Sequence, residues 1–512
     1  MRALLLSIVL SLPCAAGDWP QWRGPLRNGV QPSSPKLLGA IPEGGLRELW
    51  ESEPIPANND GGLASPIAAD GKVFVSLIWH RREPTETRQI GSEALEKLGH
   101  HSTKGLSPEL LATIEETRRT IPASLRGKKL DEFIDAWIAE HFDEKTKEQF
   151  GGFVRERFKK GALALPLDVL AALGQQRATI FTTDAEMGQW LDAQGWPEPT
   201  KQQIIAAVPV TKKVADDAVV ALDLETGKTL WKRLSPGAPV GQEAAATPAF
   251  ADGKVYAAGS SRVWCLDAAT GVVVWETAFK KKRSISSSLL HSDGLVILNT
   301  DGVTAYDAAT GEERWQQKKA GGGNSSPVSW NGLVLINGSK ELQALDLRSG
   351  AIVWSAPGGG DATPAIVGET LVVQTANKEL GLAAYRLSAA AATKLWNFPF
   401  EARRNQSSAL VHDGAVYLMD DEFHSCFDLA NGSQRWREPA PSNISSPVLA
   451  DGKLFTMANN GNTLLVLKPS ADARMEIGKA NVRAQWVPSP CIAGDRLVLR
   501  LADKLKCWSL AP

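Results

Sequence analysis

The chain has 512 residues, and its 56 Lys and Arg almost balance its 57 Asp and Glu, so the formal net charge at pH 7 is −1. That balance excludes the overall basic field that draws a protein to nucleic acid or to an anionic membrane surface. Length alone would suggest about three or four domains. The chain also repeats itself, however, and a repeat takes precedence over length in predicting the fold.

The first seventeen residues are typical of a secretory signal peptide. Arg2 gives a positive start, residues 3–12 form an apolar run too short to span a bilayer, and small residues follow Cys14. We therefore expect an exported protein, periplasmic or secreted. Lipid anchoring at Cys14 is not favoured, because Leu and Pro precede it where a lipoprotein signal has small residues. No later run is long and apolar enough to predict a transmembrane segment.

One motif returns along the second half of the chain. Its first copy, ALDLETGKTLW, begins at Ala221, and related copies begin at Cys265, Ala305, Ala344 and Cys426. Asp223 can accept hydrogen bonds from backbone N–H groups further along the turn, and Gly227 can take a positive φ. An Asp-Gly or Asn-Gly turn between apolar runs, as at residues 252–253, adds a second hairpin. Each repeat is therefore predicted to be a four-stranded antiparallel meander.

The Trp that ends the motif sets the period of the repeat. Successive motif tryptophans are separated by about forty residues, the length of one β-propeller blade. They are Trp231, Trp275, Trp315, Trp354, Trp396 and Trp436. One blade cannot bury both faces of its sheet, so blades must stack. We expect each indole ring to fill the space between two blades, seated against a small Ala or Cys of the neighbouring blade.

Eight short runs of small residues mark the starts of eight blades. The last repeat ends after its third strand, whereas residues 46–52, with Trp50, have the pattern of a lone fourth strand. Joining the two closes the ring and removes exposed sheet edges. The predicted fold is thus all-β, an eight-bladed β-propeller. Two repeats depart from the pattern: the fifth has an Ala-rich stretch, 388–393, in place of its turn, and the seventh has no motif Trp.

Four cysteines remain beyond the signal peptide, and all stand at small-residue positions of the repeats. They are Cys265, Cys426, Cys491 and Cys507. There is no CxxC and no adjacent pair. We expect buried free thiols that pack as small apolar groups.

Residues 81–215 interrupt the first repeat and are predicted to be an α-helical insertion. Residues 130–138 carry apolar side chains at the spacing of an amphipathic helix, and helix starts are expected at Ser107 and Thr183. The domains are therefore a signal peptide (1–17), an N-terminal extension (18–45), the propeller (46–80 and 216–512) and the insertion. The insertion is either a helical domain packed on the propeller rim or a lid or partner-docking module. Its entry between the second and third strands puts it on the face of the blade-to-blade loops.

The motif from Ala221 through Asp223 and Gly227 to Trp231 resembles the tryptophan-docking motif of the pyrroloquinoline-quinone (PQQ)-type repeat. The resemblance covers about residues 46–80 and 216–512. It implies an eight-bladed propeller of the quinoprotein alcohol dehydrogenase-like superfamily. That superfamily contains dehydrogenases and also non-enzymes, including a BamB-like subunit of the outer-membrane protein assembly machinery. The start of the mature chain, DWPQWRGP from Asp18, resembles the opening of secreted propeller proteins with such repeats.

The resemblance implies what a dehydrogenase of this superfamily would contain: an adjacent Cys pair, calcium held by carboxylate and amide oxygens, and an Asp base. This sequence has no adjacent Cys pair and no CxxCH haem motif. Asp420, Asp421, Glu422 and His424 could suggest a metal, but an acidic run at a turn is normally solvated. We therefore expect no metal site and no cofactor, with PQQ and calcium only under a dehydrogenase interpretation.

The loops that enter the innermost strands should surround the funnel mouth and form the candidate binding face. They carry Asp60, Glu243, Arg283, Asn324, Asp361, Arg404, Asn405, Asn443, Gln485 and Trp486. These side chains could bind a small polar ligand or a peptide loop, or could simply cap turns. The sequence favours a monomeric, non-catalytic binding scaffold of the cell envelope, with an envelope protein or small polar ligand as partner. The alternative is a divergent PQQ-dependent oxidoreductase acting on an alcohol or sugar.

Overall fold

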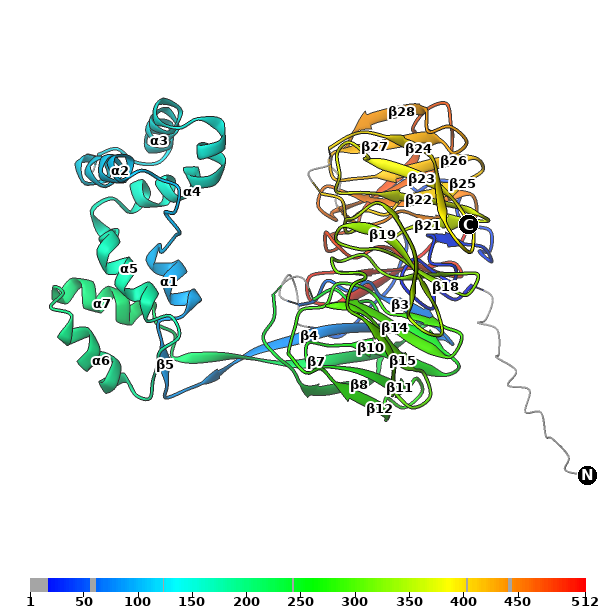
Figure 1. The fold of residues 1–512 in the computed structure, drawn as a ribbon, viewed down its shortest axis with the longest axis horizontal. Helices are drawn as coiled ribbons and strands as arrows, with labels where there is room; N and C mark the ends of the chain where they lie inside the picture. The colour runs from blue at the N-terminus through cyan, green and yellow to red at the C-terminus, as the bar shows by residue number, and fades with distance from the viewer. Residues whose placement is uncertain (1–16, 56–60, 123, 242–243, 402–403, 441–443) are drawn as a thin grey trace, which may run out of the picture. The chain divides into compact units, whose positions relative to one another are not determined.

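The computed structural model describes residues 17–55, 61–122, 124–241, 244–401, 404–440 and 444–512. The chain divides into two compact units (Figure 1). One contains Met1–Arg81 and Val214–Pro512, and we call it the propeller unit. The other, Arg82–Lys213, is the helical unit.

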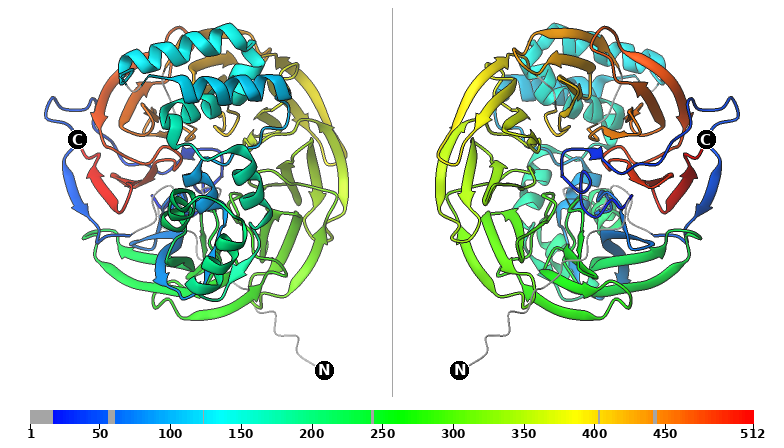
Figure 2. Two further views of the ribbon diagram at one scale, coloured as in Figure 1. Left: turned by 90° about the vertical axis from the view of Figure 1, so that its left-hand side faces the viewer. Right: turned by 90° about the vertical axis from the view of Figure 1, so that its right-hand side faces the viewer.

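The described part of the propeller unit forms eight sheets, seven with four strands and one with five. Within each sheet the four main strands pair antiparallel with their neighbours. Figure 2 shows the sheets following one another around a central axis. The predicted β-propeller is therefore confirmed.

The innermost of the four main strands is the shortest in every sheet, with three residues. The first sheet contains β3 (Ile67–Ala69), β4 (Lys72–Pro84), β7 (Thr211–Asp223) and β8 (Thr229–Pro236). The second contains β9 (Ala249–Ala251), β10 (Lys254–Ala258), β11 (Arg262–Asp267) and β12 (Val273–Ala278). The third contains β13 (Leu290–Ser292), β14 (Leu295–Thr300), β15 (Gly302–Asp307) and β16 (Glu313–Gln317). The fourth contains β17 (Val328–Trp330), β18 (Leu333–Asn337), β19 (Glu341–Asp346) and β20 (Ile352–Pro357).

The remaining four sheets complete the ring. The fifth contains β21 (Ala365–Val367), β22 (Thr370–Gln374), β23 (Leu382–Leu387) and β24 (Ala392–Phe398). The sixth contains β25 (Leu410–His412), β26 (Ala415–Met419), β27 (Phe423–Asp428) and β28 (Gln434–Pro439). The seventh contains β29 (Val448–Ala450), β30 (Lys453–Ala458), β31 (Thr463–Lys468) and β32 (Met475–Asn481), with β1 (Val30–Gln31) as its fifth strand. The eighth contains β33 (Cys491–Ala493), β34 (Arg496–Arg500), β35 (Leu505–Ser509) and β2 (Glu48–Glu51).

The two kinds of turn have the predicted chemistry. Asp252 and Gly253 both have positive φ, 50° and 69°, which is the backbone of a tight hairpin turn. In the motif turn, the Asp223 carboxylate accepts hydrogen bonds from the Glu225 and Thr226 N–H groups and from the Thr226 hydroxyl. These bonds, the Thr226 hydroxyl first, lower the pKa of Asp223 below its ordinary value.

Most motif tryptophans dock on the next sheet through a hydrogen bond and a ring contact. The Trp315 indole N–H donates to the Leu347 carbonyl at 3.0 Å, and the ring covers Gly350 so closely that a Cβ there would lie 2.5 Å from it. The same donation is made by Trp50, Trp231, Trp275, Trp396 and Trp436. Apart from Trp436, these rings also cover a glycine, where no side chain fits under the ring.

The expected position of the Ala or Cys notch was wrong in one respect. Trp315 pairs across strands with Ala305 of its own sheet, and Trp275 pairs with Cys265 in the same way. The small residue therefore lets the ring lie flat on its own sheet, and the turn glycine receives it on the next sheet. The four cysteines are buried and free, as predicted.

The fifth repeat, which departs from the motif, leaves one indole without its usual acceptor. Ser388 caps the turn by accepting from the Ala391 N–H, and no Asp or Gly stands where other repeats have them. Trp354 of the fourth sheet docks against this turn, and its buried indole N–H has no hydrogen-bond partner among the described residues.

The ring is closed by the strand from the start of the chain. Trp50 in β2 pairs with Cys507 in β35, as predicted for residues 46–52. A second closure lies at the axis, where a backbone N–H at the start of each innermost strand donates to a hydroxyl of the next sheet at 2.9–3.2 Å. The ring members in order are Ser65, Thr247, Ser288, Ser326, Thr363, Ser408, Ser446 and Ser489, and Ser489 donates back to Ser65.

The N-terminal extension replaces the Trp that the seventh sheet lacks. Gly478 stands at the Trp position, and a Cβ on it would lie 2.8 Å from the Ile41 nitrogen. The Leu38 N–H donates to the Leu510 carbonyl at 2.8 Å, and Leu510 is the residue of the eighth sheet that corresponds to the indole acceptors elsewhere. Leu37 is buried in an apolar cluster together with Ala480 of the seventh sheet and Leu510 of the eighth. Residues 37–41 therefore supply both the apolar contact and the N–H donor of a docking Trp.

The helical unit contains seven α-helices in its described residues and a short β5–β6 pair. The helices are α1 (Ser92–Leu98), α2 (Pro108–Thr120), α3 (Lys128–His141), α4 (Glu144–Lys160), α5 (Leu167–Gln175), α6 (Asp184–Ala193) and α7 (Glu198–Ala207). The pair is β5 (Arg88–Gln89) with β6 (Ile180–Phe181), and a short 3-10 turn, Gly161–Leu163, follows α4. The three predicted helix features are confirmed: α3 covers 130–138, Ser107 caps α2 and Thr183 caps α6.

Two apolar clusters hold the helical unit together. One joins α2, α3 and α4 around Trp137 and Phe158, and the other joins α1, α5, α6 and α7 around Leu173 and Ile204. Beside the first cluster, the Glu115 carboxylate bridges the buried guanidinium groups of Arg118 and Arg157.

Removal of a docking indole should cost stability without changing the fold. For Trp315→Ala we expect the free energy of unfolding to fall by about 3–5 kcal/mol, as for other buried aromatic truncations. Chemical denaturation followed by circular dichroism measures this. Val274→Ala, at an exposed strand position, is the control and should stay within about 0.5 kcal/mol of the parent. A loss below about 1 kcal/mol for Trp315→Ala would contradict the docking role.

Because residues 37–41 take the place of the seventh Trp, substitution of Gly478 should change stability in an unusual direction. An alanine is normally better than glycine inside a strand by roughly 0.5–1 kcal/mol. Gly478→Ala should nevertheless destabilise the full chain, by about 1–3 kcal/mol, because its Cβ overlaps Ile41. In a chain that starts at residue 46 the same substitution should be neutral or stabilising. Equal effects in both chains would refute the contact.

Candidate binding pocket at the propeller axis

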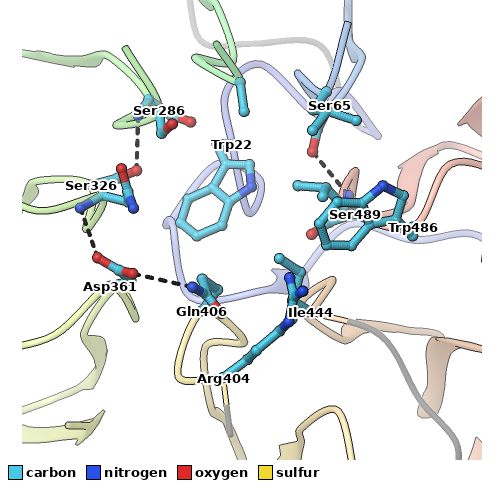
Figure 3. Close-up of a pocket in the computed structure, with 15 residues that line it drawn as sticks. Trp22, Ser65, Ser286, Ser326, Asp361, Arg404, Gln406, Ile444, Trp486 and Ser489 are labelled. Atoms are coloured by element: carbon cyan, nitrogen blue, oxygen red, sulfur yellow. Dashed lines mark hydrogen bonds between the residues drawn. The ribbon is translucent and has the colours of Figure 1, made fainter. Parts of the chain in front are cut away.

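The loops that lead into the innermost strands converge on a pocket at the propeller axis (Figure 3). Its volume is about 310 Å³. The lining consists of ring hydroxyls with neighbouring polar and apolar side chains: Trp22, Leu63, Ser65, Ala245, Ser286, Ser288, Asn324, Ser326, Asp361, Arg404, Gln406, Ile444, Trp486, Val487 and Ser489. The hydroxyl ring that closes the propeller is thus also part of the pocket.

The central side chain of the pocket, Trp22, belongs to the N-terminal extension. Trp22 lies in the middle of the labelled side chains in Figure 3. The segment that carries it is fastened to the innermost strands on several sides of the ring, through a bridge between Trp19 and Ala68 and through pairing of Val30 with Leu449. The extension therefore crosses the axis and places the Trp22 indole in the pocket.

Two buried arginines anchor this segment. Arg23 donates to the carbonyls of Ala409 (2.5 Å) and Thr363 (3.5 Å), and Arg27 donates to those of Leu289 (2.6 Å) and Ser288 (3.2 Å). These carbonyls precede the innermost strands of three different sheets. Burial lowers the pKa of each guanidinium to about 9, and the charge of Arg23 adds to the effect on Arg27. Both groups are still cations at neutral pH, so positive charge lies at the axis.

The pocket walls combine an aromatic–cation pair with an acid–amide pair. The Arg404 guanidinium lies over the Trp486 ring at 5.0 Å. Opposite, Asp361 accepts from the Asn324 N–H at 3.0 Å and from the Gln406 amide at 3.2 Å. The pocket can therefore hold a flat or apolar group against indole faces and hydrogen-bond its polar edge.

The predicted funnel residues separate into three groups. Asn324, Asp361, Arg404 and Trp486 line the pocket together. Asn405, Arg283 and Gln485 do not: Asn405 accepts from the Asp361 N–H, Arg283 pairs with Asp301 at 2.9 Å, and Gln485 is buried with its N–H bonded to Arg500. Asp60, Glu243 and Asn443 lie outside the described residues.

Several lining residues were not predicted from the sequence. Gln406 and Ile444 directly follow predicted positions, and the period of the repeat could have found the ring serines. Trp22 carries no such signal, because its place depends on where the extension crosses the ring.

The acidic run at residues 420–422 is a buried turn. Asp420 and Asp421 are 2% and 8% exposed, so the expectation of a solvated run was wrong for both. Asp420 accepts from the Glu422 and Phe423 N–H groups, which caps the turn, and burial raises its pKa. His424 is fully buried and its Nδ1 accepts from Arg474 at 3.2 Å. Within the described ranges, no three His, Cys, Asp or Glu side chains gather as a metal site would require.

A quinone–calcium site does not fit the described lining of the pocket. Calcium takes about 6–8 oxygen ligands, several of them carboxylates. The described lining offers one carboxylate, Asp361, whose two oxygens already accept hydrogen bonds. The four cysteines lie in separate strands rather than as an adjacent pair.

Burial of His424 makes stability depend on pH. Burial, aided by the charge of Arg474, lowers its pKa to about 3 from 6.5. Between these values the unfolded chain binds a proton that the folded chain does not, so stability is lost as pH falls from about 6.5, by up to about 1.4 kcal/mol per unit. His424→Gln should flatten this dependence in denaturation curves measured between pH 4 and 7. An unchanged slope would show that another group governs it.

Comparisons with known proteins identify β-propeller relatives of this chain. A curated relative, "Outer membrane protein assembly factor BamB" of Moranella endobia, is 24% identical over 318 residues, which cover 56% of this chain and 78% of the relative. The protein of the same description from Yersinia pestis is 33% identical over 121 residues, 21% of this chain and 31% of that one. The solved quinohemoprotein alcohol dehydrogenase of Comamonas testosteroni has a TM-score of 0.55 and covers 96% of this chain and 80% of its own, at 13% identity, so it shows the fold alone.

No helix among the described residues is long and apolar enough to cross a membrane. The family model described as "Outer membrane protein assembly factor BamB" matches residues 215–321 and 299–511, more than half of the chain. The chain therefore belongs to this family of PQQ-type repeat β-propellers.

Proposed function

We propose that this protein is an exported, non-catalytic binding propeller of the cell envelope, which docks a partner in its axial pocket. The observation that carries the proposal is the pocket itself: two half-buried indoles, an arginine stacked on one of them, and hydroxyls of the inner ring. Trp and Arg in a concave centre are the residue types that dominate binding energy at protein interfaces. The BamB descriptions of the family and its relatives support an envelope partner.

The chain offers more support for binding than for oxidation. The cysteines that a quinone enzyme would pair are dispersed and buried, and burial raises the pKa of Cys265 and of Cys426 to about 12, so neither is a reactive thiolate at neutral pH. The helical unit leaves the propeller through β4 and β7, the second and third strands of the first sheet.

Site-specific crosslinking tests the proposal. A benzoylphenylalanine at position 324, an exposed lining position whose bond to Asp361 comes from the backbone, should yield a discrete adduct in envelopes of the native organism, and Trp486→Ala should abolish that adduct. The same probe at Lys228, in a motif turn, is the control and should yield none. Equal adducts from both positions would contradict docking at the pocket.

An activity assay tests the alternative that the protein is an oxidoreductase. The purified protein incubated with pyrroloquinoline quinone and calcium should show no dye-linked oxidation of alcohols or sugars. Sustained turnover would overturn the non-catalytic assignment.

A further inference from the structure

The loops around the pocket have a one-sided charge. The four loops that enter the third to sixth sheets carry seven basic and two acidic residues in their described parts. Lys280, Lys281, Lys282, Lys318 and Lys319 are all exposed. The chain as a whole has a formal net charge of −1, so this basic excess is local to these four loops. A basic arc beside a concave site attracts and orients partners of the opposite sign.

Little of this charge is neutralised inside the site. Arg283 is paired with Asp301, but Arg404 is held by the Trp486 ring rather than by a carboxylate. The buried cations Arg23 and Arg27 add positive charge behind the pocket, since their bonds go to carbonyls.

The interior has a different chemistry from the basic loops. Leu63, Ile444 and Val487 line it together with the indoles of Trp22 and Trp486. Asp361 places a negative charge within the same wall, so the ligand group next to it must be uncharged, such as a peptide N–H that donates to it. The Gln406 amide gives one N–H to Asp361 and has a second N–H that can donate to a peptide carbonyl.

We propose that the pocket binds an acidic peptide segment of a partner protein, with one apolar or aromatic side chain seated against Trp22 and Trp486. Carboxylates on either side of that anchor meet Arg404 and the lysines of the basic loops. This inference rests on the proposed docking function and adds the chemistry of the partner. An oligonucleotide or an acidic oligosaccharide would match the basic loops but not the apolar interior.

Isothermal titration with defined probes tests the inference. The first probe is a capped peptide that alternates Glu and Gly around a central Phe; the others replace every Glu by Gln, or Phe by Ser. We expect the Glu–Phe peptide to bind, with an affinity that falls as salt rises, and both altered peptides to bind at least about fivefold more weakly. Equal binding of the Gln peptide would overturn the charge argument.

Variants and competing polyanions locate the interaction. Trp486→Ala and Arg404→Gln should each weaken peptide binding at least about fivefold, whereas Lys228→Gln, an exposed lysine in a motif turn, should leave it unchanged. Binding of oligogalacturonate or oligothymidylate without binding of the Glu–Phe peptide would overturn the peptide assignment. If the crosslink from position 324 persists while the peptide fails to bind, the ligand chemistry is wrong and the docking function stands. If neither the crosslink nor peptide binding is observed, both the docking function and the proposed ligand chemistry are wrong.

Discussion

A sheet of four short strands cannot keep both faces out of water, and the whole architecture follows from that constraint. Seven of the eight sheets of this protein cover the next sheet with an indole ring. In five of them the indole N–H bonds to a carbonyl of the next sheet and the ring face leaves room only for glycine. The contact is local, but every sheet needs a neighbour on each side. Only a closed ring satisfies them all.

The N-terminal extension shows how strictly this requirement is met. Where the seventh sheet lacks its Trp, residues 37–41 insert an apolar contact and a backbone N–H in its place. Earlier in the same extension, Arg23 and Arg27 gather carbonyls from three sheets, and Trp22 enters the pocket. One stretch of chain thus completes the packing and shapes the site, so stability and binding are linked through it.

The site combines elements with separate origins. The hydroxyls at the start of the inner strands both close the ring and line the pocket. The Trp486–Arg404 pair and the Asp361–Gln406 pair come from the loops that precede these strands. A closed ring that presents such loops around one axis is suited to recognition. Basic loops outside and apolar groups inside then favour a partner that carries both acidic and apolar side chains.

The amino-acid sequence by itself determined the repeat, the turn chemistry, the free cysteines, the helices of the insertion and the closing strand at Trp50. Each of these depends on neighbours in the chain or on a regular spacing, so the pattern of residues is enough to predict it. Four of the ten expected funnel residues proved to share a pocket, because loops at equivalent points of a repeat converge at the axis. Only the tertiary structure placed Trp22 in that pocket, set Ile41 against Gly478 and buried Asp420. Those contacts join segments hundreds of residues apart or outside the repeat, where no spacing in the sequence records which groups will meet.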